Sequence, residues 1–337
     1  MNVGSYYKIY HFIPWTKRNI YKIALISIIP TILYGVFGIT WIAIPWAIVA
    51  LVGVGAAFIA GFRNTQTYNR LWEARQIWGS IVNDSRTWSM MIKDFITEKN
   101  TNSDSEALKT IHKRLVYRHV AWLTALRHQL RKPQVWENQH KSHFQAYLKN
   151  YKVPEWDSNI ETDIKPYLSQ TDMDLVLSRK NRATQLLGLQ SEDLKQLKKQ
   201  GLIDAFPYVQ LEGILKEFFT HQGKAERIKN FPYPRQFTSI NIYFIWLLAI
   251  LIPFALVKPL SELGTYGVWL TIPISIIVGW VFTSLDQVGE STENPFEGGA
   301  NDIPMANMSR TIEIDMREML GETDLPEPIT AVNNVLM

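Results

Sequence analysis

The sequence contains no cysteine among its 337 residues, so disulfides, thiolate nucleophiles and thiolate metal ligands are excluded. It also lacks a strong excess of either charge. Its 35 Lys and Arg residues face 31 Asp and Glu residues, which leaves a net charge of +4. This balance is weak support for binding to nucleic acid, so we expect no nucleic-acid partner.

Catalytic signatures are missing too. The chain shows no glycine-rich phosphate loop, no readable Ser-His arrangement and no His-Glu pairing of the metalloprotease kind. His140 and His143 could place two imidazoles near one metal, but no third ligand has a suitable spacing, which favours a solvated loop. The sequence therefore predicts that this protein is not an enzyme.

Charge is absent from two long stretches. Residues 23–62 form an uncharged run of forty residues, and a second block at 236–285 is interrupted only by charges at 258 and 262. A bilayer core needs about 20 apolar helical residues. Each block is therefore predicted to hold two spans, with Pro45 starting the second span. Buried helices of a soluble protein are the alternative, and they rarely run so far without charge.

Basic residues mark one side of the predicted membrane. They precede the first span, follow the second and precede the third, whereas the loops on the other side carry only Lys258. The positive-inside rule predicts cytoplasmic locations for residues 1–22, 63–235 and 286–337, in the plasma (inner) membrane. Apolar residues recur at helical spacing across 107–130, so we expect 63–235 to be a helical domain. The predicted fold class is an all-α membrane protein with four transmembrane helices.

The second span is predicted to continue past Arg63 as one helix, and its last turns have two distinct ridges. A bulky ridge recurs every four residues: Val54, Phe58 and Phe62. The next ridge, about 100° round the helix, contains only small residues: Gly53, Ala57 and Gly61. The small ridge favours close helix packing, and rings of the bulky ridge could gate a pore by dewetting. On spacing alone, contact of the Phe residues with lipid or another span is equally favoured.

Acidic residues gather at 286–302, just after the fourth predicted span. Their carboxylates, together with backbone carbonyl groups, could bind a hard cation such as calcium. The alternative is a solvated turn beside the membrane.

Several motifs resemble one known family. Residues 62–79 resemble the signature that follows the second span of bestrophins, most closely their bacterial homologues: Phe62, Arg63, Asn64, Thr65, Tyr68, Asn69, Arg70, Trp72, Glu73, Ala74, Arg75, Trp78 and Gly79. Residues 293–296, 301–304 and 310–315 are similar to its C-terminal motif. The resemblance covers nearly the whole chain and agrees with four spans around a helical middle.

The resemblance implies a homopentameric channel that conducts small monovalent ions through a central pore, with itself, permeant ions and membrane lipid as partners. A neck of three apolar rings in that family matches Val54, Phe58 and Phe62. A second, cytoplasmic restriction would fall at Phe206 or Ile203. Animal members pass chloride and bacterial homologues have been described as passing cations, so the sign of the permeant ion stays open.

Animal bestrophins also bind calcium in a clasp after the fourth span. Asn294 and Asp302 match that pattern, but the acids between them are replaced by residues 297–300, of which only Glu297 is acidic. The resemblance thus implies at most a weak cation site with calcium as its ligand. The main alternative to a channel is a membrane-anchored scaffold whose helical domain binds a partner.

Overall fold

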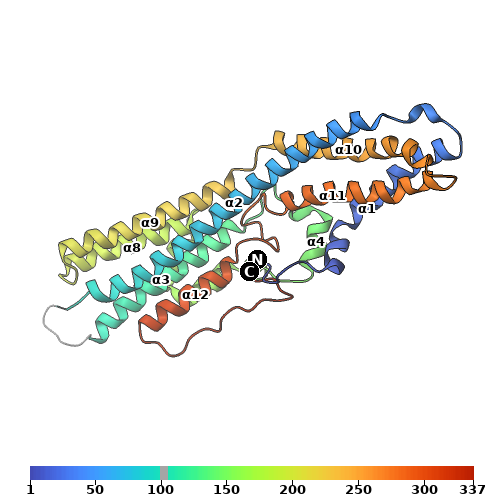
Figure 1. Ribbon diagram of the computed structural model, residues 1–337. Helices are drawn as coiled ribbons and strands as arrows, with labels where there is room; N and C mark the ends of the chain where they lie inside the picture. Colours follow the sequence, from blue (N-terminus) through green and yellow to red (C-terminus); the bar gives the residue numbers. More distant parts are fainter. Residues whose placement is uncertain (99–104) are drawn as a thin grey trace. The chain divides into compact units, whose positions relative to one another are not determined.

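The computed structural model describes residues 1–98 and 105–337. Every regular element in these residues is helical, and the predicted all-α class is confirmed. The described chain divides into two compact units (Figure 1). One unit, called the hairpin unit here, comprises residues 4–71 and 232–294. The other, called the bundle unit, comprises residues 1–3, 72–231 and 295–337.

The hairpin unit is built from long apolar helices. It contains α1 (Ile9–Gly35), the first half of α2 (Trp46–Phe95), α10 (Arg235–Ser261), α11 (Thr271–Glu290) and the short turns η1 (Thr40–Ile42) and η4 (Gly267–Leu270). α1 packs against both α10 and α11, and those two pack against each other (Figure 1). On α11, Gly279 permits this approach, because a Cβ atom there would lie 3.0 Å from the Ile23 side chain.

α2 begins directly after Pro45, where the sequence predicted a helix start. Proline suits this position because its missing N–H has no partner in the first helical turn. The helix then runs without interruption for 50 residues to Phe95. The apolar stretch and the charged, aromatic segment after Arg63 are thus parts of one helix, as predicted.

Three helical segments in the described chain are long and apolar enough to cross a membrane, rather than the four predicted. They are Thr40–Phe95, Arg235–Ser261 and Gly267–Glu290. α1 differs because Lys17, Arg18 and Lys22 lie in its first half. Its uncharged part, residues 23–35, is shorter than the roughly 20 residues that a bilayer requires.

The bundle unit places α3 at its centre, packed against α6, α8, α9 and α12. α3 (Glu106–Leu130) covers the amphipathic stretch from which a helix was predicted, and Ser105 caps it by accepting a hydrogen bond from the Leu108 amide. The remaining elements are the second half of α2, η2 (Asn138–His140), α4 (Ser142–Leu148), α5 (Pro154–Asp157), α6 (Ile160–Ile164), η3 (Lys165–Tyr167), α7 (Gln170–Leu177), α8 (Arg182–Lys199), α9 (Ala205–Asn230) and α12 (Met305–Met319).

A fully buried histidine lies in the core of the bundle unit. His119 packs between Trp122 and Phe218, with ring centroids 5.0 and 4.5 Å away, and its Nε2 lies 2.8 Å from the Ser85 hydroxyl. Burial lowers the pKa of His119 to about 3. The imidazole is therefore neutral at physiological pH and serves the core as a polar packing residue.

Candidate pore-facing surface of α2

One face of the apolar half of α2 carries bulky side chains that the chain leaves uncovered. Val54, Phe58 and Phe62 are 70%, 74% and 44% exposed. Among the described residues of the hairpin unit, Phe62 alone of the three has a ring neighbour, Phe237 of α10, at a centroid distance of 6.0 Å. The three residues predicted as a pore neck thus form an exposed apolar ridge, here called the neck ridge.

The opposite face of α2 is buried against α10. Val49, Ala56 and Ala60 are each at most 1% exposed. Val49 and Ala56 join one apolar cluster with residues of α10: Leu248, Ile252 and Ala255. Alanines one helical turn apart, at positions 56 and 60, let the helices come close, as in other membrane helix pairs.

The predicted small-residue ridge takes little part in packing within the chain. Gly53 lies at the edge of the α10 contact, where a Cβ atom would be 3.6 Å from Leu248. Ala57 and Gly61 are exposed, and no atom would lie within 4 Å of a Cβ atom at Gly61. Packing of this ridge against a neighbouring subunit stays a prediction.

A buried charged cluster, here called the Arg63 cluster, lies behind the neck ridge. The Arg63 side chain is 2% exposed and donates hydrogen bonds to Asp286 and, over 2.7 Å, to Glu293. Arg235 donates to the second oxygen of Glu293 over 3.1 Å, and Asn241 donates to Asp286 over 2.7 Å. Two guanidinium groups thus balance two carboxylates, which is the condition for burying such charges.

Polar contacts of residues just after Arg63 hold α2 in one rotational setting. The Asn64 amide donates to the Leu285 carbonyl over 3.1 Å, and the Thr292 hydroxyl donates to the Thr67 hydroxyl over 2.9 Å. These partners belong to α11 and the residues just after it. Because the same helix face carries all these contacts, the neck ridge is directed away from the rest of the unit.

Sequence reasoning missed this cluster. The acids of 286–302 were interpreted as a candidate cation site. In the structure, Arg63 pairs with Asp286, which lies 223 residues away in sequence, and with Glu293, which lies 230 residues away. Arg235 also pairs with Glu293. A signal was present, since Arg63 continues the buried ridge of Ala56 and Ala60 at helical spacing. A buried arginine at that position requires carboxylate partners.

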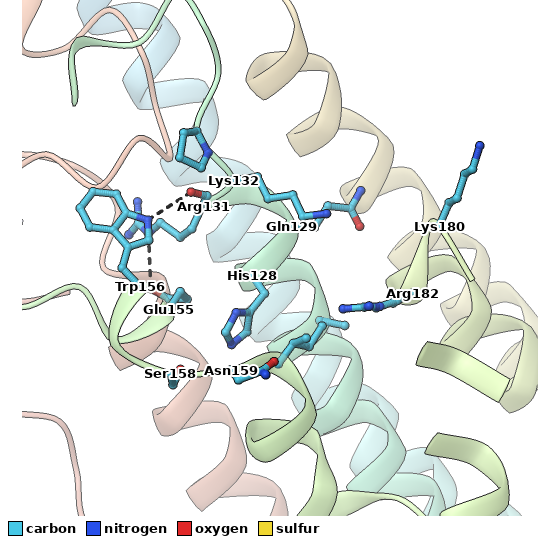
Figure 2. A pocket seen from close by; sticks show the side chains of 13 residues that line it. His128, Gln129, Arg131, Lys132, Glu155, Trp156, Ser158, Asn159, Lys180 and Arg182 are labelled. Atoms are coloured by element: carbon cyan, nitrogen blue, oxygen red, sulfur yellow. Dashed lines mark hydrogen bonds and ion pairs between the residues drawn. The ribbon is translucent and has the colours of Figure 1, made fainter. Parts of the chain in front are cut away.

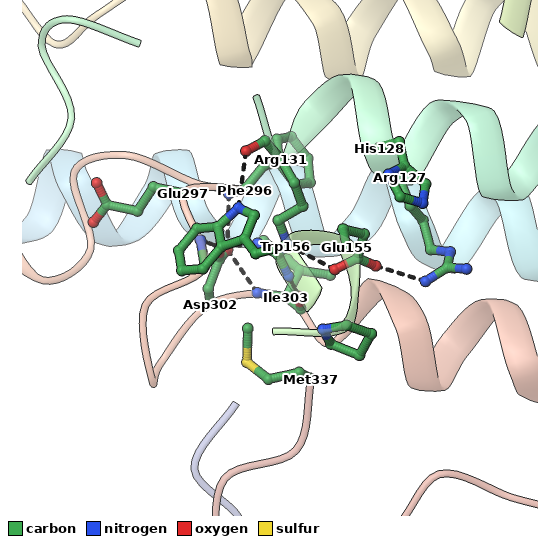
Figure 3. Close-up of polar contacts among 12 residues, drawn as sticks. Arg127, His128, Arg131, Glu155, Trp156, Phe296, Glu297, Asp302, Ile303 and Met337 are labelled. Carbon is green, nitrogen blue, oxygen red and sulfur yellow. Dashed lines mark hydrogen bonds and ion pairs between the residues drawn. The ribbon is translucent and has the colours of Figure 1, made fainter. Parts of the chain in front are cut away.

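Asp302, one of the two residues of the predicted cation site, is surrounded by hydrogen-bond donors (Figure 3). Its carboxylate accepts from the amides of Phe296, Gly298 and Ile303 over 2.7–2.8 Å and from Arg131 over 2.5 Å. A cation would meet repulsive N–H groups here. No group of three acids or histidines suited to a metal occurs in the described part of the chain. The weak cation site at Asn294 and Asp302 stays a prediction.

The donor to Asp302 belongs to a second ion-pair network, drawn in Figure 3. Arg131 is 1% exposed and also faces Glu155 over 3.5 Å, while Arg127 donates to Glu155 over 2.6 Å. Burial raises the pKa of Glu155, but Arg127 and Arg131 outweigh that effect and hold it below its ordinary value. Glu155 is therefore ionised near neutral pH.

The two residues predicted for a cytoplasmic restriction differ in setting. Phe206 is 73% exposed in the first turn of α9, whereas Ile203 is 3% exposed within the bundle unit. Of the two, Phe206 has the exposed side chain, and the cytoplasmic restriction itself stays a prediction.

Comparison with known proteins decides the family. Residues 13–318 match the family model described as Bacterial/Fungal Bestrophin protein. The chain belongs to this bestrophin family. The resemblance found in the sequence is thereby confirmed, as is the prediction of a channel-forming membrane protein rather than an enzyme.

Curated relatives of this bestrophin carry a functional name. This chain is 28% identical over 311 residues to the voltage-dependent anion channel-forming protein YneE of Escherichia coli, and the match covers 92% of this chain and 86% of that protein. It is 24% identical over 282 residues to a voltage-dependent anion channel-forming protein of Ralstonia nicotianae, covering 84% of this chain and 79% of that protein.

A solved structure supports the fold. The bestrophin superposes on the crystal structure of a bacterial bestrophin homolog from Klebsiella pneumoniae with a TM-score of 0.74 and 26% sequence identity. The match covers 91% of this chain and 98% of that one. The bestrophin-like helical fold is therefore shared over nearly the whole length.

Proposed function

We propose that this bestrophin assembles as a homopentamer and conducts small anions such as chloride through a central pore, with Val54, Phe58 and Phe62 as its neck. The observation that carries the proposal is the neck ridge itself. A helix buried on one face leaves large apolar side chains uncovered at positions spaced by four residues. In a ring of identical subunits these side chains would form three stacked apolar rings, which can close a pore by dewetting.

Anion conduction is favoured over cation conduction for two reasons. Relatives that align with most of this chain are named as anion channel-forming proteins. The edge of a phenylalanine ring is also slightly positive, so the rings of Phe58 and Phe62 can face an anion edge-on. Phe206, exposed at the start of α9, is the candidate for a second, cytoplasmic restriction.

The membrane layout of the proposed channel follows from the hairpin unit. α10, α11 and the apolar half of α2 cross the bilayer, and residues 23–35 of α1 enter it because α1 packs along α10 and α11. The basic flanks support a cytoplasmic location for both termini and residues 63–235, with the channel in the inner or plasma membrane. In this arrangement Gly53, Ala57 and Gly61 face the neighbouring subunit.

Planar bilayer recording of the purified protein tests the channel. Replacing Val54, Phe58 and Phe62 together with Ala widens the proposed neck, so we expect higher open probability or larger unitary conductance. Reversal potentials in asymmetric NaCl and KCl should follow the chloride gradient. Native mass spectrometry in detergent should give the mass of five chains.

A matched control replaces three exposed apolar residues of the same unit that lie off the neck ridge: Ile250, Ile277 and Val281. This triple Ala variant should conduct like the wild type. If both triple variants gave equal currents, Val54, Phe58 and Phe62 would not form the neck of the pore. A confirmed pentamer with silent bilayers would instead support the membrane-anchored scaffold, and reversal at the cation potential would overturn anion selectivity.

A further inference from the structure

A cavity of about 440 Å³ opens in the bundle unit at the C-terminal end of α3 (Figure 2). The last turn of α3, the segment holding α5 and α6, and the start of α8 line it. This volume lies within the range of roughly 300–1,000 Å³ that small-molecule sites occupy. The cavity takes no part in the proposed pore, and nothing in the bestrophin channel function requires it.

Three cationic side chains at this cavity have no carboxylate partner within the described residues. They are Lys132, Lys180 and Arg182. Both lysines are exposed and Arg182 is half-buried, with its guanidinium directed toward the side of the cavity where His128 lies in Figure 2. Three unpaired positive charges around one hollow raise the local potential for an anion.

The acids near the cavity do not neutralise these cations. Glu155 is already shared between Arg127 and Arg131, at 2.6 and 3.5 Å. Glu226 lies behind Gln129, whose amide donates to it over 2.7 Å, and it does not line the cavity. Asp163 also lies beside the cavity, where its carboxylate contacts His128 over 2.8 Å and accepts a hydrogen bond from the Ser158 hydroxyl over 2.6 Å. The positive charge offered to a ligand therefore comes from Lys132, Lys180 and Arg182.

Another part of the wall is apolar and includes one large ring. Ala125, Pro133, Trp156 and Ile160 line the cavity. The Trp156 indole donates its N–H to the Arg131 carbonyl over 3.2 Å, which sets the orientation of the ring (Figure 2). A ring held in this way offers a flat surface for the organic part of a ligand.

We propose that this cavity binds a small soluble organic phosphate. The phosphate group binds Arg182, because a guanidinium matches phosphate oxygens in pairs, and the exposed Lys132 and Lys180 nearby balance the remaining charge. The organic part lies against Trp156. A single carboxylate would leave most of the positive charge unmatched, so a phosphate dianion fits the site better.

Isothermal titration calorimetry on the purified full-length protein in detergent tests the site. The probes are AMP, adenosine, inorganic phosphate and a short-chain phosphatidic acid. We expect AMP to bind, adenosine to give no detectable heat and inorganic phosphate to bind at least tenfold more weakly than AMP. Binding of AMP should weaken as KCl rises, since partly exposed charges are screened by salt.

Two double variants make the test specific. Lys180→Gln with Arg182→Gln should weaken AMP binding at least tenfold, whereas Lys199→Gln with Lys216→Gln removes the same charge from exposed positions away from the cavity and should change it less than twofold. Size-exclusion profiles check that both variants fold.

Three results would overturn the proposal. They are no AMP binding to the folded wild type, equal weakening by both double variants, and tighter binding of the phosphatidic acid than of AMP. The last result would assign the cavity to a lipid headgroup. All of these measurements are independent of ion currents, so the site can fail while the channel function holds, and the reverse.

Discussion

Replacing Arg63 with Met tests whether the Arg63 cluster holds the pore-facing helix. The substitution keeps an apolar stem of similar length and removes the guanidinium that contacts Asp286 and Glu293. Breaking a buried pair by removing one partner costs about 3–5 kcal/mol, because a buried charge is left uncompensated. Arg235 still reaches Glu293 and Asn241 still reaches Asp286, so we expect a loss of about 3 kcal/mol.

The assay is the apparent Tm of the purified protein, followed by size-exclusion chromatography after heating. At about 2–4 °C per kcal/mol, the expected decrease for Arg63→Met is roughly 6–12 °C. Adding Glu293→Gln removes the charge that Arg63 had balanced. The double variant should therefore be more stable than the sum of the single losses by about 0.5–3 kcal/mol.

The exposed ion pair between Arg227 and Glu73 provides the control, since its side chains are 63% and 45% exposed. Arg227→Met should cost less than about 1 kcal/mol because solvent screens such pairs. If Arg63→Met lowered the apparent Tm no more than Arg227→Met does, or if the two losses at Arg63 and Glu293 simply added, the cluster would not hold α2 as we argue.

Two further predictions concern the bundle unit. The pKa of His119 is about 3 in the folded chain and about 6.5 in the unfolded chain, so the unfolded state binds more protons as the pH falls below 6.5. The wild type should therefore lose about 2 kcal/mol of stability by pH 5. The apparent Tm of His119→Gln, measured from pH 7.5 to 5, should fall less steeply than that of the wild type, and parallel curves would contradict the buried, neutral state of His119. Gly298 has a φ of +88° and a Cβ atom there would lie 2.8 Å from Trp156. Gly298→Ala should therefore cost about 1–3 kcal/mol of stability in thermal unfolding. Gly321→Ala should cost less, because φ there is +79° but the space around a Cβ atom is open. An equal loss in both variants would mean that the contact with Trp156 contributes nothing beyond the backbone strain.

Local rules predicted two helices well. Pro45 marked the start of α2, and the apolar periodicity of 107–130 marked α3, because both signals depend on neighbours in sequence. The number of spans was predicted less well, since four were expected and three helical segments of the described chain are long and apolar enough. The uncharged run from residue 23 suggested a full span, but α1 ends at Gly35, so its uncharged part has fewer than the roughly 20 residues that a bilayer requires.

At the candidate pore-facing surface, too, some features were predictable from neighbours in sequence and others were not. Helical periodicity alone placed Val54, Phe58 and Phe62 on one line, and resemblance to the bestrophin motifs named them as a neck. The acids after α11 were interpreted as cation ligands, because their spacing says nothing about which donors reach them. In the fold, Asp286 and Glu293 meet Arg63, while Asp302 meets Arg131 and three amides.

The amino-acid sequence by itself therefore determined the family, the all-helical class and the angular relations between residues along α2. These follow from chain-local geometry, which repeats every 3.6 residues in any helix. Only the tertiary structure decided which face of α2 is covered, since that depends on α10 and on carboxylates more than 200 residues away. Burial of a charge requires its partner at contact distance, and contact distance is a property of the folded chain.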